Sequence, residues 1–321
     1  MKESLLEYLI CPDDGAELEF TSAQKDSLQC KKCARVVPIR EGIPDFTEQG
    51  NYTGNFGFQW NKFDKTQLDS YSGLSISKDR FFQVTGWSPD APEEVALEVG
   101  CGAGRFTEVA ATTGRTLISV DASEAVFANG RNNGDKENVH IVRADLRHLP
   151  FRQHSFHKVF CLGVLQHTPD PKASFDFIAK MPKKNGGEFA FDVYGRTWNT
   201  IFWSKYWLRP VTKNIPDEKL FAFLEKAVKP LLLVHDIIRL IPGIGRSLAY
   251  HLVPVCTYKY SWPLNKQQNY EWALLDTFDM LSPTYDIPCS MEEVVSWCEN
   301  HSPASHKADY GPNGIIGLMK Y

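Results

Sequence analysis

Three glycines at alternate positions, Gly100, Gly102 and Gly104, stand between an apolar run and a helical pattern in the segment LEVGCGAGRF. Glycine at such a point permits a tight turn and lets the backbone approach a ligand closely. The spacing here is GxGxG, whereas dinucleotide-binding enzymes carry GxGxxG after their first strand. The loop therefore predicts a bound cofactor and disfavours an NAD-dependent enzyme.

Three acidic residues stand where successive apolar runs end. Glu98 comes just before the glycines, Asp121 ends the next run and Asp145 follows the third. An acid at the end of the second strand can hold ribose hydroxyls, and ligands of open α/β sheets bind along this edge. Each acid alone also has a structural explanation, as a surface strand end, a helix N-cap and a turn residue respectively. Such explanations account poorly for acids at the ends of three consecutive strands.

The elements that must position these residues alternate between short apolar runs and helical patterns, which is typical of βαβ units around a parallel sheet. We expect six strands, over residues 95–99, 117–121, 139–143, 158–162, 187–194 and 314–319. Helices are expected around residues 78–85, from 104, and over 124–132, 171–181 and 290–297. Ser290 and Glu293 form a candidate capping box for the last of these helices.

The glycine loop, the three acids, the segment CLGVLQH at residues 161–167 and the turn KKNGG at 183–187 together resemble a known family. It is the class I, seven-stranded, S-adenosylmethionine-dependent methyltransferases of type 11-like sequence, matched over residues 93–194 and 291–321. The resemblance implies an α/β fold with a doubly wound, seven-stranded, mostly parallel sheet. It also implies methyltransferase activity, with S-adenosylmethionine as the cofactor.

The same resemblance implies roles for individual residues. Glu98 and the glycines would line the methionine end of the cofactor, Asp121 would hold the ribose hydroxyls, and Asp145 with the Leu146 backbone would read the adenine amine. Residues 161–167 would close over the methionine and the sulfonium. The full expected cofactor set is Glu98, Gly100, Cys101, Gly102, Gly104, Arg105, Asp121, Ala122, Asp145, Leu146 and Leu162.

The chain divides into four segments that differ in sequence pattern and composition. Residues 1–46 predict a small β ribbon, and residues 47–92 a connector and lid. Residues 93–194 and 287–321 predict the Rossmann-like methyltransferase domain. Residues 195–286 interrupt that domain with an aromatic-rich, helical pattern far longer than an ordinary connection. We expect this insertion to cap the ligand crevice.

The N-terminal segment carries Cys11, Cys30 and Cys33 and resembles the Trm112-like zinc ribbons that accompany some methyltransferases. In that pattern four cysteines close a tetrahedral, structural Zn²⁺ site. Here Asp14 stands in the place of the second cysteine. Either Asp14 supplies an oxygen ligand in a mixed site, or the metal is lost and packing holds the ribbon. In both cases we expect the ribbon to be a separate appendage without a role in catalysis.

Methyl transfer from a sulfonium is an in-line displacement, so holding the acceptor in a dry site supplies much of the catalysis. A base is needed only if the acceptor must lose a proton. His167 is the candidate base because it follows the fourth expected strand; otherwise it caps the following turn and shapes the pocket. Candidate acceptor contacts are Tyr194, Tyr285 in the segment DMLSPTYD, and Gln59 and Trp60 in the lid.

The net charge of −4 over 321 residues lacks the basic field of a phosphate-backbone binder, so a nucleic-acid partner is disfavoured. We therefore expect methylation of a small molecule, which can be a secondary metabolite, sugar or lipid modified at O, N or C. The alternatives are an RNA methyltransferase and a non-catalytic binding module that kept the cofactor fold. The sequence gives no indication of the oligomeric state.

Location and membrane contact follow from the apolar segments and the cysteines. The N-terminus lacks a secretory pattern, and scattered cysteines suit a reducing compartment, so a cytoplasmic protein is expected. The apolar stretch over residues 231–256 is interrupted by Asp236, Arg239 and Arg246 and is a poor transmembrane span. A peripheral, membrane-surface helix and a buried cap helix both remain open.

Overall fold

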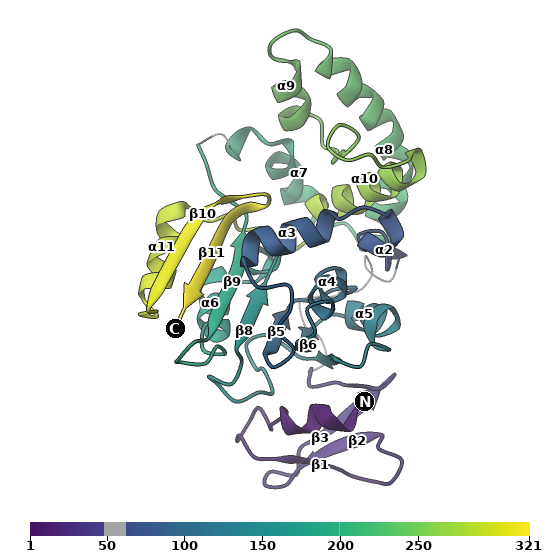
Figure 1. Ribbon diagram of the computed structural model, residues 1–321. Coiled ribbons are helices and arrows are strands. Elements are labelled where there is room, and N and C mark those ends of the chain that lie inside the picture. The colour runs from purple at the N-terminus through teal and green to yellow at the C-terminus, as the bar shows by residue number, and fades with distance from the viewer. Residues whose placement is uncertain (48–61, 199) are drawn as a thin grey trace.

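The computed structural model describes residues 1–47, 62–198 and 200–321. Its centre is a seven-stranded sheet in the order β10-β11-β9-β8-β5-β6-β7 (Figure 1). The strands are β5 (Val95–Val99), β6 (Thr116–Asp121), β7 (Val139–Arg143), β8 (Lys158–Cys161), β9 (Glu188–Val193), β10 (Ser305–Gly311) and β11 (Gly314–Lys320). Strands β5 to β9 are parallel, and β11 runs antiparallel to both of its neighbours. The expected seven-stranded, mostly parallel sheet is confirmed.

The sixth strand along this sheet's chain order, β10, has no counterpart among the six strands expected from periodicity. Its sequence SHKADYG is polar, and its residues are exposed or half-buried because β10 forms an edge of the sheet. All five residues of β7, at the other edge, are buried. Apolar runs therefore mark the covered strands and leave β10 unmarked.

Helices cover both faces of the sheet, as a doubly wound fold requires. One face packs against α3 (Ile76–Thr85), α4 (Arg105–Ala111) and α5 (Ala125–Asn133), through a cluster that includes Phe81, Val109 and Phe127. The other face packs against α6 (Pro171–Ile178) and α11 (Met291–Glu299). The capping box at the start of α11 is confirmed, since Glu293 N donates to Ser290 Oγ at 3.2 Å and Ser290 N donates to Glu293 Oε2 at 2.6 Å.

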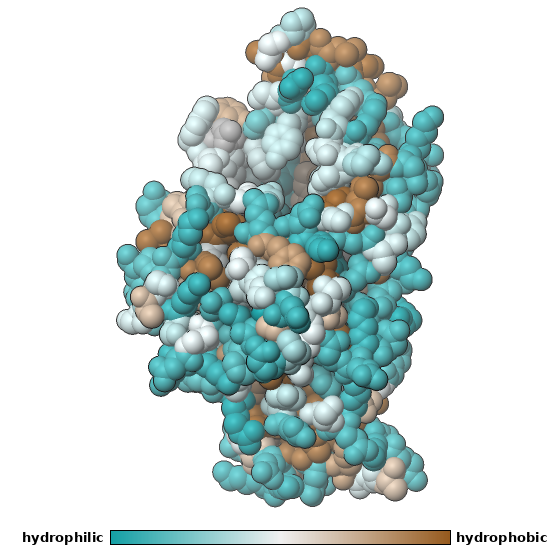
Figure 2. Space-filling model, in the orientation of Figure 1, coloured by the Kyte–Doolittle hydropathy of each residue, from teal (hydrophilic) through white to brown (hydrophobic). Residues whose placement is uncertain are grey.

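The insertion between β9 and α11 forms a helical cap above the sheet (Figure 1). Its helices are α7 (Ser204–Thr212), α8 (Asp217–Arg239), α9 (Gly245–Leu252) and α10 (Lys266–Leu281). Helices α8 and α10 share a core of their own, which includes Phe221, Leu224 and Phe278 and takes in Phe63 from the connector. Hydrophobic residues also gather on the outside, at the top of the cap in Figure 2. None of the helices among the described residues is long and apolar enough to cross a membrane.

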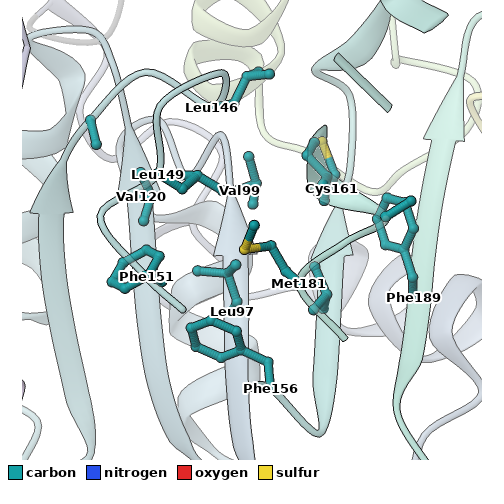
Figure 3. Packing of buried hydrophobic residues seen from close by; sticks show 14 of the residues in the cluster. Leu97, Val99, Val120, Leu146, Leu149, Phe151, Phe156, Cys161, Met181 and Phe189 are labelled. Atoms are coloured by element: carbon teal, nitrogen blue, oxygen red, sulfur yellow. The ribbon is translucent and has the colours of Figure 1, made fainter. Parts of the chain in front are cut away.

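The N-terminal ribbon consists of η1 (Glu3–Glu7), β1 (Leu18–Phe20), β2 (Ser27–Cys30), β3 (Val36–Arg40) and β4 (Ile43–Pro44). The expectation of a separate appendage is wrong, because the ribbon and the sheet share one hydrophobic core that joins Leu5 and Leu9 to Leu97. Figure 3 shows Phe151 and Phe156 beside Leu97 in this core.

The connection between β7 and β8 explains this shared core. Residues 144–157 are all described and contain no helix, so this part of the sheet face would otherwise be bare. The ribbon takes that place. Ile10 N donates to Pro150 O at 2.9 Å, and Phe46 N donates to Arg143 O at 2.8 Å at the edge of β7. A buried ion pair of 2.9 Å between Asp45 and Arg143 reinforces the contact.

Candidate functional site

A cavity of about 1460 Å³ lies between the carboxyl edge of the sheet and the cap. A typical ligand pocket measures roughly 300–1,000 Å³, so this cavity has room for two ligands. Eight of the eleven expected cofactor residues line it: Gly100, Cys101, Gly102, Arg105, Asp121, Ala122, Leu146 and Leu162. Glu98, Gly104 and Asp145 lie outside the lining.

The glycine loop is shaped by close contacts that only glycine allows. Gly100 has a φ of +81°, and a Cβ placed on it would lie 2.3 Å from Val164 Cγ2. Gly104 has a φ of +96°, and a Cβ there would lie 2.2 Å from Asn129 Oδ1. The amides of Gly100 and Cys101 both donate to Val120 O, at 2.7 and 3.0 Å. These contacts hold the loop against β6 and against the segment after β8.

Asp121 connects the end of β6 to the glycine loop. Its Oδ2 accepts a hydrogen bond from Gly102 N at 2.8 Å, while its Oδ1 accepts from Ser123 N at 2.8 Å and from Ser123 Oγ at 2.7 Å. The N-cap of α5 is Glu124, so Asp121 is not a helix N-cap. Asp121 orders the loop and also lines the cavity.

Glu98 lies beneath the glycine loop, and the explanation that it is a surface strand end is wrong, since only 2% of it is exposed. Its Oε2 accepts from Thr107 Oγ1 at 2.5 Å and from Ser119 Oγ at 2.7 Å. Burial raises the pKa of Glu98 to about 7, and the nearby charge of Asp121 acts in the same direction. The carboxyl group therefore supports α4 and β6 from behind the cavity wall.

Asp145 is a turn residue, as its alternative structural explanation proposes. Its Oδ1 accepts from Arg147 N at 2.9 Å, and its Oδ2 lies 2.6 Å from Arg147 Nη2. The neighbours Ala144 and Leu146 line the cavity. In this arrangement the carboxylate of Asp145 is paired with Arg147 beside the cavity.

Arg105 is half-buried and makes its contacts with the connector and the cap. Its Nε donates to Ser77 Oγ at 2.9 Å and its Nη1 donates to Gln67 Oε1 at 3.1 Å. Burial lowers the pKa of Arg105 to about 10, with Arg80 acting in the same direction. Its guanidinium also lies over the ring of Trp272, at 5.8 Å from the ring centroid.

A polar cluster in the cap, absent from the sequence-based expectations, forms the far wall of the cavity. Asp276 in α10 accepts hydrogen bonds from Tyr258 Oη and from Gln67 Nε2, the latter at 2.9 Å. Burial raises the pKa of Asp276 to about 6, and Asp279 acts in the same direction. Tyr258 stacks on Trp262 with ring centroids 4.2 Å apart. The available sequence signal was the pair of acids, Asp276 and Asp279, in the otherwise apolar stretch ALLDTFDML.

His167 and Tyr194 lie together in the cavity wall, with ring centroids 5.4 Å apart. His167 Nδ1 lies 3.1 Å from Tyr285 O. A carbonyl oxygen only accepts, so Nδ1 carries the proton in the neutral ring and Nε2 is the basic nitrogen. Tyr285 thus contributes its backbone, and its side chain is not part of the lining. Gln59 and Trp60 fall outside the described residues.

A buried ion pair stands next to His167. Lys205 Nζ lies 3.0 Å from Asp286 Oδ2, and both side chains are buried. Burial opposes the ionisation of Asp286, but the charges of Lys205, His167 and Arg209 outweigh it and hold the pKa of Asp286 below its ordinary value. Lys205 Nζ also lies 4.7 Å from the ring centroid of Tyr194. The cap is therefore anchored by charge at the edge of the cavity.

The four expected metal ligands of the ribbon converge. One ligand atom from each of Cys11, Asp14, Cys30 and Cys33 lies within 4.8 Å of the others. Cys11 Sγ and Cys33 Sγ are 3.6 Å apart, and Cys30 Sγ is 3.5 Å from Asp14 Oδ1. A tetrahedral zinc ion with Zn–S bonds of 2.3 Å separates its sulfur ligands by about 3.8 Å. The cluster therefore has the size of a tetrahedral zinc site.

The environment of Cys30 also suits a metal-bound thiolate. The amides of Lys32 and Cys33 both point at Cys30 Sγ from 3.4 Å. Burial opposes ionisation of this thiol, but these amides outweigh it, and the pKa of Cys30 lies below its ordinary value.

Comparison with known proteins gives two family matches. Residues 97–191 match the methyltransferase domain and residues 2–42 match Trm112p-like proteins. Over 184 residues the chain is 28% identical to the ubiquinone biosynthesis O-methyltransferase of Acinetobacter baumannii (strain AYE), an alignment that covers 54% of this chain and 73% of the relative.

Two solved structures overlap the chain in part. One, from Methanococcus maripaludis, is assigned as an S-adenosyl-L-methionine-dependent methyltransferase; it has a TM-score of 0.44 and 13% identity over 86% of this chain and 96% of that chain. The other is a complex between the Haloferax volcanii Trm112 methyltransferase activator and its assigned methyltransferase, with a TM-score of 0.35 and 19% identity over 43% of this chain and 58% of that chain. With its glycine loop, strand order and two family matches, the chain carries a class I S-adenosylmethionine-dependent methyltransferase domain and an N-terminal Trm112p-like segment.

Proposed function

We propose that this methyltransferase modifies a small molecule that is held between the glycine loop and the helical cap. The observation that supports this most directly is a continuous cavity whose lining runs from Gly100 and Asp121 to Tyr258 and Asp276 in the cap. It offers a cofactor end and an acceptor end within one continuous space. An acceptor the size of a folded RNA would need an open surface instead.

The residues at the sheet end fit S-adenosylmethionine, which supplies an electrophilic methyl group when it is bound. The glycine loop leaves space where side chains would clash, and Asp121 places a carboxylate in the lining for the ribose hydroxyls. The apolar side chains of Leu146 and Leu162 would flank the adenine. Glu98 would act through the loop that it supports, and Asp145 would reach the adenine amine only if Arg147 turned away.

At the cap end the residues would bind the acceptor and remove its proton. Aromatic side chains would exclude water and orient the acceptor: Tyr194, Trp203, Tyr206, Tyr258, Trp262 and Trp272. We assign proton acceptance to Nε2 of His167, because Nδ1 is held by the carbonyl of Tyr285. The carboxylate of Asp276, together with Tyr258, would hold a second polar group of the acceptor.

The relative from Acinetobacter baumannii is an O-methyltransferase of ubiquinone biosynthesis, which favours an aromatic hydroxyl as the first acceptor to test. The aromatic cap wall is compatible with such a ring. We further propose that Cys11, Asp14, Cys30 and Cys33 bind a structural Zn²⁺ ion in the ribbon, where the distances between ligand atoms support it.

Calorimetric titration with S-adenosylmethionine and S-adenosylhomocysteine tests the cofactor site. We expect micromolar binding by the native chain and a loss of at least about tenfold for Asp121→Ala, since one charge-assisted contact is worth roughly 1.5–3 kcal/mol. Asp309→Ala, an exposed acid on β10, is the matched control and keeps native affinity. A folded native chain that binds neither compound would leave only the non-catalytic alternative. Methyl transfer to phenols then tests the acceptor.

A further inference from the structure

The second half of α8 is apolar on two faces. Its inner face packs Val228, Leu231 and Ile238 into and against the core of the cap. Its outer face and the turn that follows expose a stripe of six aliphatic residues at intervals of three or four: Leu233, Val234, Ile237, Leu240, Ile241 and Ile244. We call these six residues the cap tip. A surface helix normally carries polar residues on its outer face, so an apolar outer stripe is unusual for a helix that faces water.

The exposure of the cap tip is large and continuous. Leu240 is 80% exposed, Leu233 62% and Ile244 59%. Figure 2 shows hydrophobic residues at the top of the molecule, where Figure 1 places the turn between α8 and α9. Single exposed aliphatic residues are ordinary, but a contiguous apolar surface marks an interaction site.

The charge of the insertion indicates the chemistry of the partner. Residues 195–286 contain eleven lysines and arginines and eight acids, whereas the rest of the chain contains 24 bases and 31 acids. Arg239 lies within the range of the cap tip and Arg246 lies two residues after it. An apolar stripe within a basic segment complements a bilayer with anionic headgroups, where each base near the surface contributes about 1 kcal/mol.

The cavity lies on the inner side of the same hairpin. Its lining includes His235 and Arg239 of α8 and Arg246 and Tyr250 of α9. The α8–α9 hairpin thus separates the acceptor end of the cavity from the apolar cap tip by the thickness of one helix layer. A molecule that leaves the bilayer beside the cap tip would be close to this end of the cavity.

We propose that the cap tip docks on an anionic membrane surface, with its aliphatic side chains at the boundary between headgroups and acyl chains. A consequence, which rests on the proposed function, is that the acceptor is an amphiphile taken from the lipid phase. Docking itself does not depend on methyl transfer, so it is tested without cofactor or acceptor.

The test is flotation of the full chain with vesicles of phosphatidylcholine alone and of phosphatidylcholine mixed with phosphatidylglycerol. We expect the native chain to bind the mixed vesicles, with weaker binding at high salt. The double variant Leu240→Asp/Ile244→Asp should bind on the order of a hundredfold more weakly, because each change removes one inserted aliphatic group and adds a repelled charge. Both positions are exposed, so the melting temperature should not fall.

Val36→Asp provides the matched control. Val36 is 56% exposed on β3 in the ribbon, at the opposite end of the molecule (Figure 1), and its variant should bind vesicles like the native chain. The proposal is overturned if the native chain ignores mixed vesicles, or if the double variant binds them equally well. It is also overturned if the double variant only dissociates a dimer, or if RNA is bound and vesicles are not. A chain that docks but fails to bind S-adenosylmethionine would contradict the proposed function alone.

Discussion

Gln67 Nε2 donates a hydrogen bond of 2.9 Å to the carboxylate of Asp276, which joins the cap to the connector beneath it. On its other side, Gln67 Oε1 accepts from Arg105 at the start of α4. One amide therefore links the acceptor end of the cavity to the helix that follows the glycine loop. The two ends of the cavity are thus connected through half-buried hydrogen bonds.

Replacing Asp276 by Asn should lower methyl transfer by about tenfold to a hundredfold, since the carboxylate that orients the acceptor is lost. Burial and Asp279 raise the pKa of Asp276 to about 6, so native kcat/KM should fall as the pH drops through that value. The Asn variant should lack this limb of the profile. Glu271→Gln, on the same helix, is the control and should keep both the rate and the limb. If kcat/KM of the Asp276→Asn variant still fell at low pH as in the native enzyme, the carboxylate of Asp276 would not be the group that titrates.

Replacing Glu98 by Gln should raise the free energy of unfolding relative to the native chain, and this gain should be larger at pH 8 than at pH 5. Because the folded pKa is about 7 and the ordinary value is 4.5, the native fold loses stability as the pH rises between these values. The full loss is about 3 kcal/mol above pH 7, and the neutral amide avoids it. Urea unfolding at both pH values gives the comparison. If the substitution changed the free energy of unfolding equally at pH 5 and pH 8, the pKa of Glu98 would not be raised in the folded protein.

Sequence periodicity predicts most of the sheet because its strands are buried and therefore apolar. It misses β10, whose edge position allows polar residues such as Lys307 and Asp309 along its length. It also misplaces the ribbon as a separate unit, since no local pattern shows that the connection between β7 and β8 lacks a helix. The packing partner of the ribbon is a property of the whole fold.

In the candidate functional site, too, local motifs could be predicted from the sequence and contacts between distant residues could not. The glycine loop and Asp121 are local motifs, and both lie in the cavity wall. The cluster of Gln67, Tyr258 and Asp276 joins positions up to 209 residues apart, so only the folded chain brings it together. Neighbouring side chains also determine the contacts of a motif residue. The carboxylate of Asp145, for example, forms an ion pair with the guanidinium of Arg147.

Asp45→Ala should destabilise the methyltransferase domain as well as the ribbon. It removes a buried partner of Arg143, and a loss of about 2–3 kcal/mol is expected, moderated because Glu124 still lies 2.7 Å from that guanidinium. All eight tryptophans lie at or beyond residue 60, so their fluorescence reports on the domain and not on the ribbon. A urea transition that shifts in tryptophan fluorescence supports the shared core. An unchanged fluorescence transition would mean that the ribbon unfolds independently.

Metal removal extends this argument to the cysteine cluster. If the four ligands bind zinc, a chelator should lower the stability read by tryptophan fluorescence, because a ligand held at a hundred times its Kd stabilises the fold by about 2.7 kcal/mol. Zinc content per chain should fall in Cys30→Ser and in Asp14→Ala. It should persist in Asp13→Ala, whose carboxylate pairs with Arg35 outside the cluster. Asp14→Cys should bind zinc more tightly, since it completes a set of four thiolates. A native chain that contains no zinc and is indifferent to chelator would show that hydrophobic packing alone holds the ribbon.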